Sequence, residues 1–255
     1  MEGLHAPAKT LKGRLKRIAF LVSLKKVVWK FPELRMRQRR NFAILSKEYG
    51  QFASMKLWSC VDGKGNPIPW YTYPAIEYLS HLDLSDRKVF EYGSGNSSLW
   101  WAGRCQALTS IEDNRKWYEK INLAAKCLQN FDYQYVEGMA AFIEQENIAG
   151  SDIVIIDGSY RSECADYVLQ KIRQRYLDPV FLVFDNSDWY PQTMARLNKE
   201  LNWIQVDFAG FGPINSYTWT TSIFINPSHA SRPAYSRALD SVAGIVMEEP
   251  PAGVP

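Results

Sequence analysis

The middle of the chain alternates between short apolar runs and longer stretches in which apolar residues recur at helical spacing. The apolar runs predict five strands, at residues 89–91, 107–112, 133–136, 152–158 and 179–186. The run at 152–158 is nearly continuous, which is typical of a parallel strand covered on both faces. The intervening stretches, such as residues 117–128 and 163–175, predict helices. This alternation predicts an α/β fold with one open, mostly parallel sheet.

Two further apolar runs, at residues 203–208 and 217–225, bring the number of predicted strands to seven. The loop between them, residues 210–215, is too short to hold a crossover helix, so these two strands should pair antiparallel. Before them, Pro191 is well placed at the first position of a helix that runs to about residue 201. The predicted sheet is therefore doubly wound and ends in an antiparallel hairpin.

The first 40 residues differ from the rest in charge and predict a helical N-terminal extension. They hold twelve Lys/Arg and two acidic residues, a balance of +10 in a chain of net charge +3, which leaves −7 for residues 41–255. Apolar residues at helical spacing among basic ones predict a basic amphipathic helix from Lys12 to Trp29, and Pro32 should end it. The apolar run at residues 18–24 is too short to span a bilayer.

Residues 1–40 are thus a basic arm with three interpretations. The arm can be a solvated helix packed on the domain or on a second subunit, it can contact an anionic membrane surface through residues 11–40, or it can bind nucleic acid. The negative balance of the remaining chain disfavours nucleic acid, because phosphate binding needs basic charge near the site.

Three further regions follow the arm. Residues 41–80 form a bridging segment and substrate-side cap, with a turn at 62–67 and aromatic residues at 70–73 that either pack in the core or line a substrate mouth. Residues 81–226 form the main domain. Residues 227–255, rich in Ser, Pro and Ala, predict a weakly ordered tail.

The four cysteines and three histidines are dispersed along the chain. No C-x-x-C pair is present, which argues against a zinc site and against a disulfide framework. Free cysteines suit a reducing compartment, so we expect a cytoplasmic protein, either free or in peripheral contact with a membrane.

The strongest chemical signal follows the first predicted strand, where Glu91-Tyr92-Gly93-Ser94-Gly95 leads into a helical pattern. Glycines permit a tight turn and let a ligand approach the backbone closely. The helix start offers free N–H groups, and Asn96, Ser97 or Ser98 can cap it. A strand, glycine turn and helix in this order are typical of a nucleotide-binding α/β unit, although ordinary loops share the pattern.

Residues 74–226 resemble the class I S-adenosylmethionine-dependent methyltransferases. The resemblance rests on the glycine turn, on Glu112 at the end of the second strand, on Gly138-Met139-Ala140 after the third, and on the closing hairpin. It implies a Rossmann-like methyltransferase fold in residues 81–226, with S-adenosylmethionine as cofactor. The implied cofactor-binding residues are Glu91, Gly93, Gly95, Asn96, Glu112, Asp113, Gly138 and Met139.

In this resemblance Glu112 would accept hydrogen bonds from both ribose hydroxyls, which one carboxylate can do. Asp113 could exchange roles with it, and Glu112 could instead cap the next helix. Ser98 stands where a strict dinucleotide fingerprint has glycine, which counts against NAD or FAD.

The fourth and fifth predicted strands each end in an acidic residue, Asp157 and Asp185 respectively. Asn186 directly follows Asp185. Two carboxylates and an amide oxygen suit Mg²⁺ or Ca²⁺, and the arrangement resembles that of the catechol and caffeoyl-coenzyme A O-methyltransferases. The lysine base that this resemblance implies after the first aspartate is missing. Three interpretations stay open: a metal site at Asp157, Asp185 and Asn186; metal-free methylation with either aspartate as base or substrate ligand; and simple helix caps.

Further candidates lie near these acids. Tyr160 could be the catalytic base if its pKa were depressed, and Arg161 suits a carboxylate or phosphate of the substrate. The other candidate substrate-binding residues are Trp189, Tyr190 and Trp70. The predicted function is O-methylation of a hydroxyl-bearing small molecule, sugar or lipid-linked compound. The alternative is a non-catalytic nucleotide-binding scaffold that the basic arm recruits to a membrane or partner.

Overall fold

The computed structural model describes residues 32–229 and 241–244. The chain divides into two compact units, residues 1–45 and residues 46–255. The predicted amphipathic helix at 12–29 and most of the predicted tail at 227–255 lie outside the described residues. Within the described ranges, no helix has the length and apolarity needed to cross a bilayer.

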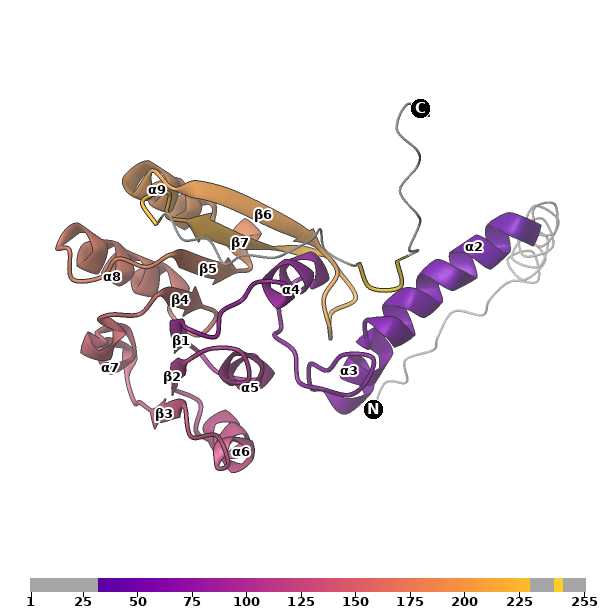
Figure 1. The fold of residues 1–255 in the computed structure, drawn as a ribbon, viewed down its shortest axis with the longest axis horizontal. Coiled ribbons are helices and arrows are strands. Elements are labelled where there is room, and N and C mark those ends of the chain that lie inside the picture. The colour runs from indigo at the N-terminus through magenta and orange to yellow at the C-terminus, as the bar shows by residue number, and fades with distance from the viewer. Residues whose placement is uncertain (1–31, 230–240, 245–255) are drawn as a thin grey trace, which may run out of the picture. The chain divides into compact units, whose positions relative to one another are not determined.

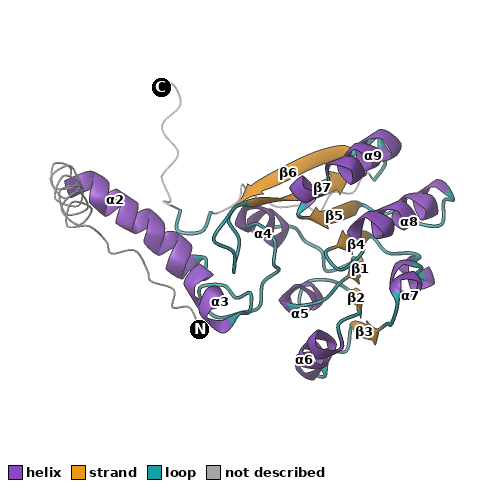
Figure 2. Ribbon diagram, turned by 180° about the vertical axis from the view of Figure 1, so that it is seen from behind, coloured by secondary structure: helices purple, strands orange, loops and turns teal. Residues whose placement is uncertain are grey.

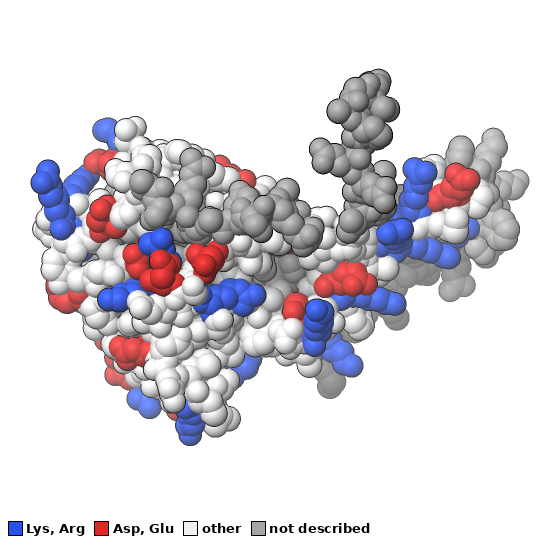
Figure 3. Space-filling model, viewed as in Figure 1, with Lys and Arg blue, Asp and Glu red and all other residues white. Residues whose placement is uncertain are grey.

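The described part of the first unit holds the helix α2 (Pro32–Ala43), which the sequence did not predict, and the start of the short helix Ile44–Glu48. Pro32 begins it, and a proline at the first helical position loses no hydrogen bond that the helix would otherwise make. The exposed apolar residues of α2, Leu34, Met36 and Phe42, point to different sides of the helix at 3.6 residues per turn. Its basic residues are the four arginines Arg35, Arg37, Arg39 and Arg40 (Figure 3), so this helix carries charge without an apolar face.

The second unit is built on a seven-stranded sheet in the order β3-β2-β1-β4-β5-β7-β6. The first five strands pair in parallel, and β7 runs antiparallel to both β5 and β6. The predicted parallel sheet with a closing antiparallel hairpin is therefore confirmed. The strands are β1 (Lys88–Tyr92), β2 (Ala107–Glu112), β3 (Phe131–Tyr135), β4 (Ile153–Ile156), β5 (Phe181–Asp185), β6 (Ile204–Gly210) and β7 (Trp219–Ile225).

Helices cover both faces of the sheet, as the doubly wound prediction requires (Figures 1 and 2). One face carries α4 (Tyr73–Ser80), α5 (Asn96–Ala102) and α6 (Arg115–Ala125), and the other carries α7 (Met139–Ile143), α8 (Arg161–Arg173) and α9 (Pro191–Leu201). The remaining helical segments are short: Ile44–Glu48, α3 (Gln51–Leu57), Glu146–Ile148 and Ser187–Trp189. All four residues of β4 are buried, which fits a strand covered on both faces.

The bridging segment is fixed to the closing hairpin by Thr72. Its backbone N–H donates to Thr221 Oγ1 at 3.1 Å, and its Oγ1 donates to the Phe208 carbonyl at 2.8 Å. The neighbouring Tyr71 and Tyr73 are buried, so these two aromatic residues pack in the interior. The bridging segment is therefore held beside the carboxyl end of the sheet, where the candidate site lies.

Candidate functional site

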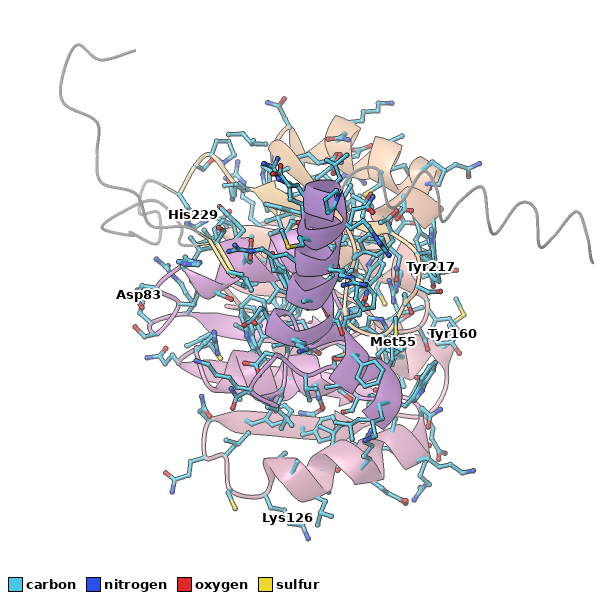
Figure 4. The ribbon with its side chains drawn as sticks, turned by 90° about the vertical axis from the view of Figure 1, so that its right-hand side faces the viewer. Met55, Asp83, Lys126, Tyr160, Tyr217 and His229 are labelled. Atoms are coloured by element: carbon cyan, nitrogen blue, oxygen red, sulfur yellow. The ribbon has the colours of Figure 1, made fainter. Side chains whose placement is uncertain are left out.

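A cavity of about 800 Å³ lies at the carboxyl ends of the parallel strands. Its wall comes from the turns after β1, β2, β4 and β5, from the loop between β6 and β7, and from the bridging segment. Figure 4 shows Tyr160 and Tyr217 at one edge of the molecule and Asp83 and His229 at the opposite edge. Asp83 precedes β1 and Tyr160 follows β4. The edge with Tyr160 and Tyr217 is therefore the carboxyl edge of the sheet, where open α/β sheets bind ligands.

The turns after β1 and β4 touch through their backbones. Gly93 has φ +85°, and a Cβ there would lie 2.5 Å from Gly158 Cα; a Cβ on Gly158 would lie 2.7 Å from Gly93 N. Only glycine fits at either position without moving the other turn. The sequence predicted that Gly93 belongs to a cofactor-binding turn, but it did not predict a role for Gly158. The only indication of such a role in the sequence was that Gly158 directly follows the aspartate at the end of a predicted strand.

Glu91 lies beneath the glycine turn and does not line the cavity. Its carboxylate accepts hydrogen bonds from the hydroxyls of Ser97 at 2.5 Å, Ser98 at 2.5 Å and Ser110 at 2.6 Å. Complete burial raises its pKa to about 7, although the three hydroxyls act in the opposite direction. Glu91 thus joins β1 to β2 and to the start of α5, and it shapes the turn from below.

Glu112 lies at the cavity wall beside the same turn. Its Oε2 accepts hydrogen bonds from Ser94 N at 3.1 Å and Ser94 Oγ at 2.8 Å, and its Oε1 accepts one from Asn114 N at 2.9 Å. Burial raises the pKa of this carboxyl. The N-cap of α6 is Asn114, whose side chain accepts from Trp117 N, so Glu112 is not the cap of that helix.

Two more residues shape this half of the cavity. Trp117 Nε1 donates to the Ser94 carbonyl at 2.5 Å, and the indole lies against Gly95. Asn96 Nδ2 donates to Ser59 Oγ at 3.1 Å and to the Cys60 carbonyl at 2.6 Å, which ties the bridging segment to the glycine turn. The sequence treated Trp117 only as part of the helical pattern, and nothing in its spacing distinguished it from a core residue.

The other half of the cavity holds Asp157 and Asp185. Asp185 Oδ1 accepts hydrogen bonds from Thr221 Oγ1 at 2.6 Å and Trp219 Nε1 at 3.0 Å. Burial raises the pKa of Asp185 to about 6 and that of Asp157 well above its usual range, while the Arg161 guanidinium acts in the opposite direction on both. Asp157 Oδ1 forms an ion pair with Arg161 at 2.8 Å. Within the described chain, its Oδ2 has no protein partner.

Two aromatic pairs border the cavity. Trp58 and Trp70 meet edge to face with ring centroids 6.1 Å apart, and Trp189 and Tyr217 lie 6.4 Å apart. Trp70 and Trp189 were predicted to bind substrate, and the structure places both on the cavity wall. Trp58 was missed, because the short helix α3 that presents it gave no periodic signal.

Most of the candidate residues come together at this cavity. Its lining includes Gly93, Gly95, Asn96, Glu112, Asp113, Asp157, Arg161, Asp185, Asn186, Trp70 and Trp189. Four candidates lie outside the lining besides Glu91: Gly138, Met139, Tyr160 and Tyr190. Tyr160 is exposed and packs against Phe142, and Tyr190 packs against Phe184. The structure therefore gives Tyr160 no place among the groups that face the cavity.

No family model matches the sequence, and no curated protein matches it either. Solved structures with a similar fold include a methyltransferase from Pyrococcus furiosus, at 15% identity over 74% of this chain and 98% of that chain, with a TM-score of 0.45. Precorrin-6y C5,15-methyltransferase from Geobacter metallireducens GS-15 has 16% identity over 59% and 87% of the two chains, with a TM-score of 0.45. M. jannaschii TYW2 in complex with AdoMet has 14% identity over 65% and 81%, with a TM-score of 0.42. At such values the likeness does not decide function.

Proposed function

We propose that this protein is an S-adenosylmethionine-dependent methyltransferase that methylates a hydroxyl group of a small molecule, sugar or lipid-linked compound. The observation that carries the proposal is the position of the Glu112 carboxylate. It lies on the cavity wall at the end of β2, 2.8 Å from Ser94 Oγ of the glycine turn that follows β1. A carboxylate at the end of one strand and a glycine turn after the adjacent strand are the features with which open α/β sheets bind nucleotides.

The residues present fit this cofactor. S-adenosylmethionine, when bound, supplies a methyl group on an activated sulfonium. Glu112 would accept hydrogen bonds from the ribose hydroxyls, and Gly93 and Gly95 leave the backbone open to a close approach. Four acidic residues line the cavity, Glu112, Asp113, Asp157 and Asp185, so the wall favours a ligand of positive charge.

Asp157 is the residue that we propose as general base. Its Oδ2 has no partner among the described residues, while Oδ1 is fixed by Arg161. Burial raises its pKa, which makes the carboxylate a stronger base than an exposed aspartate. It would take the proton from an acceptor hydroxyl held between the aromatic pairs Trp58–Trp70 and Trp189–Tyr217.

The test is a thermal-shift titration with S-adenosylhomocysteine, with NAD in parallel. At about a hundred times its dissociation constant a specific ligand stabilises a fold by roughly 2.7 kcal/mol. We expect a shift with S-adenosylhomocysteine alone. Glu112→Ala should weaken the affinity by about a hundredfold through the loss of two charge-assisted hydrogen bonds.

The matched control is Glu119→Ala, an exposed glutamate of α6 that does not line the cavity. It should bind S-adenosylhomocysteine as the wild type does. An unchanged affinity of the Glu112→Ala variant would show that the ribose site is placed wrongly. No shift with S-adenosylhomocysteine in the wild type would contradict the whole proposal and would favour the non-catalytic scaffold.

We further propose a cytoplasmic setting, supported by the four cysteines, Cys60, Cys105, Cys127 and Cys164, which are all free. Peripheral membrane contact through residues 11–40 stays a prediction, because most of this segment lies outside the described residues. Cosedimentation with anionic vesicles, compared between the full chain and a variant lacking residues 1–40, tests it.

A further inference from the structure

Arg161 lies in the middle of the three side chains for which a divalent-ion site was one of three interpretations of the sequence. It is the first residue of α8 and follows Asp157 by four positions. Its side chain reaches back across the turn after β4 toward the end of β5. There Nη1 donates to Asn186 Oδ1 at 2.6 Å, Nη2 pairs with Asp157 Oδ1 at 2.8 Å, and Nη1 lies 3.8 Å from Asp185 Oδ2.

Main-chain carbonyls complete the surroundings of the guanidinium. Nε donates to the Gly158 carbonyl at 3.0 Å, Nη1 to the Asp185 carbonyl at 2.6 Å, and Nη2 to the Asp157 carbonyl at 3.2 Å. All three nitrogens therefore have protein partners, and the side chain is largely buried. To hold a carboxylate or phosphate of a substrate, as the sequence suggested, Arg161 would have to give up one of these contacts.

A divalent ion does not fit the same place. Mg²⁺ and Ca²⁺ need oxygen ligands at roughly 2.0 to 2.6 Å, and the guanidinium already lies between Asp157, Asp185 and Asn186. The ion and the arginine would also repel each other at close range in a buried site. Asp185 Oδ1 is further occupied by Trp219 and Thr221. Among the described residues, no group of three or more His, Cys, Asp and Glu side chains could hold a metal ion elsewhere.

We propose that Arg161 is the resident cation of this site and takes the place of a divalent ion. It is a positioning residue: it holds Asp157 through Oδ1 and Asn186 through Oδ1, and it lies beside the Asp185 carboxylate. The protein then needs no divalent metal. Asp157 and Arg161 form an Asp-x-x-x-Arg pattern across the turn between β4 and α8. In this pattern the arginine supplies the positive charge that a metal ion would otherwise supply.

The test uses the full-length chain and does not depend on methyl transfer. Wild type and Arg161→Ala are titrated with Mg²⁺ in a thermal-shift assay and with Tb³⁺, whose luminescence Trp219 can sensitise through its contact with Asp185. The wild type should show no Mg²⁺ shift. Arg161→Ala removes the cation and leaves its oxygen partners, so it should gain a Mg²⁺ shift of roughly 5–10 °C near a hundred times the dissociation constant.

Three further variants separate this site from surface binding. The double variant Arg161→Ala with Asp185→Asn should lose the gained shift and the sensitised emission. Arg161→Lys keeps a positive charge and should gain neither. Arg196→Ala removes an exposed arginine that pairs with Asp166 at 3.0 Å, and it should behave as the wild type does.

Two results would overturn the proposal. One is a Mg²⁺ shift in the wild type that Asp185→Asn abolishes, since the ion would then bind beside Arg161. The other is an Arg161→Ala variant that gains no metal binding. If this variant is unfolded without metal, the same titration is read as recovery of the folded state, and a failure to recover counts against the proposal. If the wild type does not bind S-adenosylhomocysteine, the proposed function is contradicted, but the results of the metal titrations are interpreted as before.

Discussion

Two carboxylates belong to each half of the site, on neighbouring strands, and the two pairs have different partners. On the β1–β2 side, Glu91 and Glu112 accept hydrogen bonds from serine hydroxyls and backbone N–H groups. On the β4–β5 side, Asp157 and Asp185 lie around the Arg161 guanidinium. Both kinds of partner favour the ionised form, but burial outweighs them and raises the pKa of the carboxyls on both sides. The difference is that the hydroxyls are neutral and the guanidinium carries a charge of its own.

Under the proposed function, this difference gives the two halves different tasks. Hydroxyls can rotate and exchange partners, so the β1–β2 side can adapt when a polar ligand arrives. A buried guanidinium with fixed partners has no such freedom, so the β4–β5 side keeps one geometry. A cofactor site and a base site need these different properties, and the following predictions test whether the division holds.

The largest effect is expected from Asp157→Asn. Loss of the proposed general base should lower turnover by roughly 10² to 10⁴-fold, while affinity for S-adenosylhomocysteine stays unchanged. The assay is transfer of a labelled methyl group to a hydroxylated acceptor found by screening. Asp113→Asn is the matched control, because Asp113 lines the cavity on the β2 side and accepts from Ser159 at 3.2 Å. Equal losses in both variants would remove the special role of Asp157.

Gly93→Ala should be the most destabilising change in the turns that join the two halves. The new Cβ would lie 2.5 Å from Gly158 Cα at φ +85°, and we expect a loss of at least about 3 kcal/mol in the free energy of unfolding. Gly65→Ala has nearly the same φ, +88°, with no atom within 4 Å of the Cβ, and should lose about 1 kcal/mol. The free energies of unfolding of both variants are measured in urea. If the two variants lost similar amounts of stability, the contact between the Gly93 and Gly158 backbones would contribute little.

Glu91→Gln should change how stability depends on pH. The pKa of Glu91 is raised from 4.5 to about 7 in the folded state, so the folded state binds this proton more tightly than the unfolded state does. The stabilisation is therefore complete below about pH 4.5 and is lost as the pH rises through about 7. Between about pH 4.5 and 7, the free energy of unfolding of the wild type should fall by up to about 3 kcal/mol relative to that of the Glu91→Gln variant.

Urea unfolding at a series of pH values measures this difference. Glu119→Gln, at an exposed position of α6, is the control and should follow the wild-type profile. A Glu91→Gln variant with the same slope between about pH 4.5 and 7 as the wild type would show that Glu91 is ionised in the folded protein throughout.

The smallest effect is expected from Trp117→Phe. The ring can still cover Gly95, but the hydrogen bond to the Ser94 carbonyl is lost. We expect a decrease of about 1 kcal/mol in the free energy of S-adenosylhomocysteine binding, which is a few-fold in affinity. Calorimetry measures this change, and Trp70→Phe is the control, since Trp70 belongs to the proposed acceptor side. If only Trp70→Phe weakened S-adenosylhomocysteine binding, the cofactor side and the acceptor side of the cavity would have to be exchanged.

Much of the fold could be predicted because it depends on local pattern. The apolar run that became β4 and the proline that begins α9 act within their own elements. The positions of Glu112 and Asp157 followed from the strand ends that precede them. The helix α3 was missed because its seven residues have little periodicity and are held by contacts made elsewhere, such as Gln51 Nε2 to the Gly212 carbonyl at 3.0 Å.

The partners of the site residues could not be predicted in the same way. Arg161 has three main-chain carbonyls among its partners, which every residue carries and which no residue type identifies. Ser110, which donates to Glu91, lies on another strand. Whether an acid faces a cation, a hydroxyl or solvent depends on these long-range contacts. The sequence therefore indicated where the acids lie without showing what compensates them.

The contact between Gly93 and Gly158 also has a consequence for sequence divergence. Each glycine occupies the space that a Cβ on the other would need, so neither position can vary while the other backbone stays in place. Distant relatives that keep this sheet should retain both glycines or change the lengths of both turns together. A search for such relatives can use this pair, 65 residues apart in the chain, as a filter where overall identity is too low to guide it.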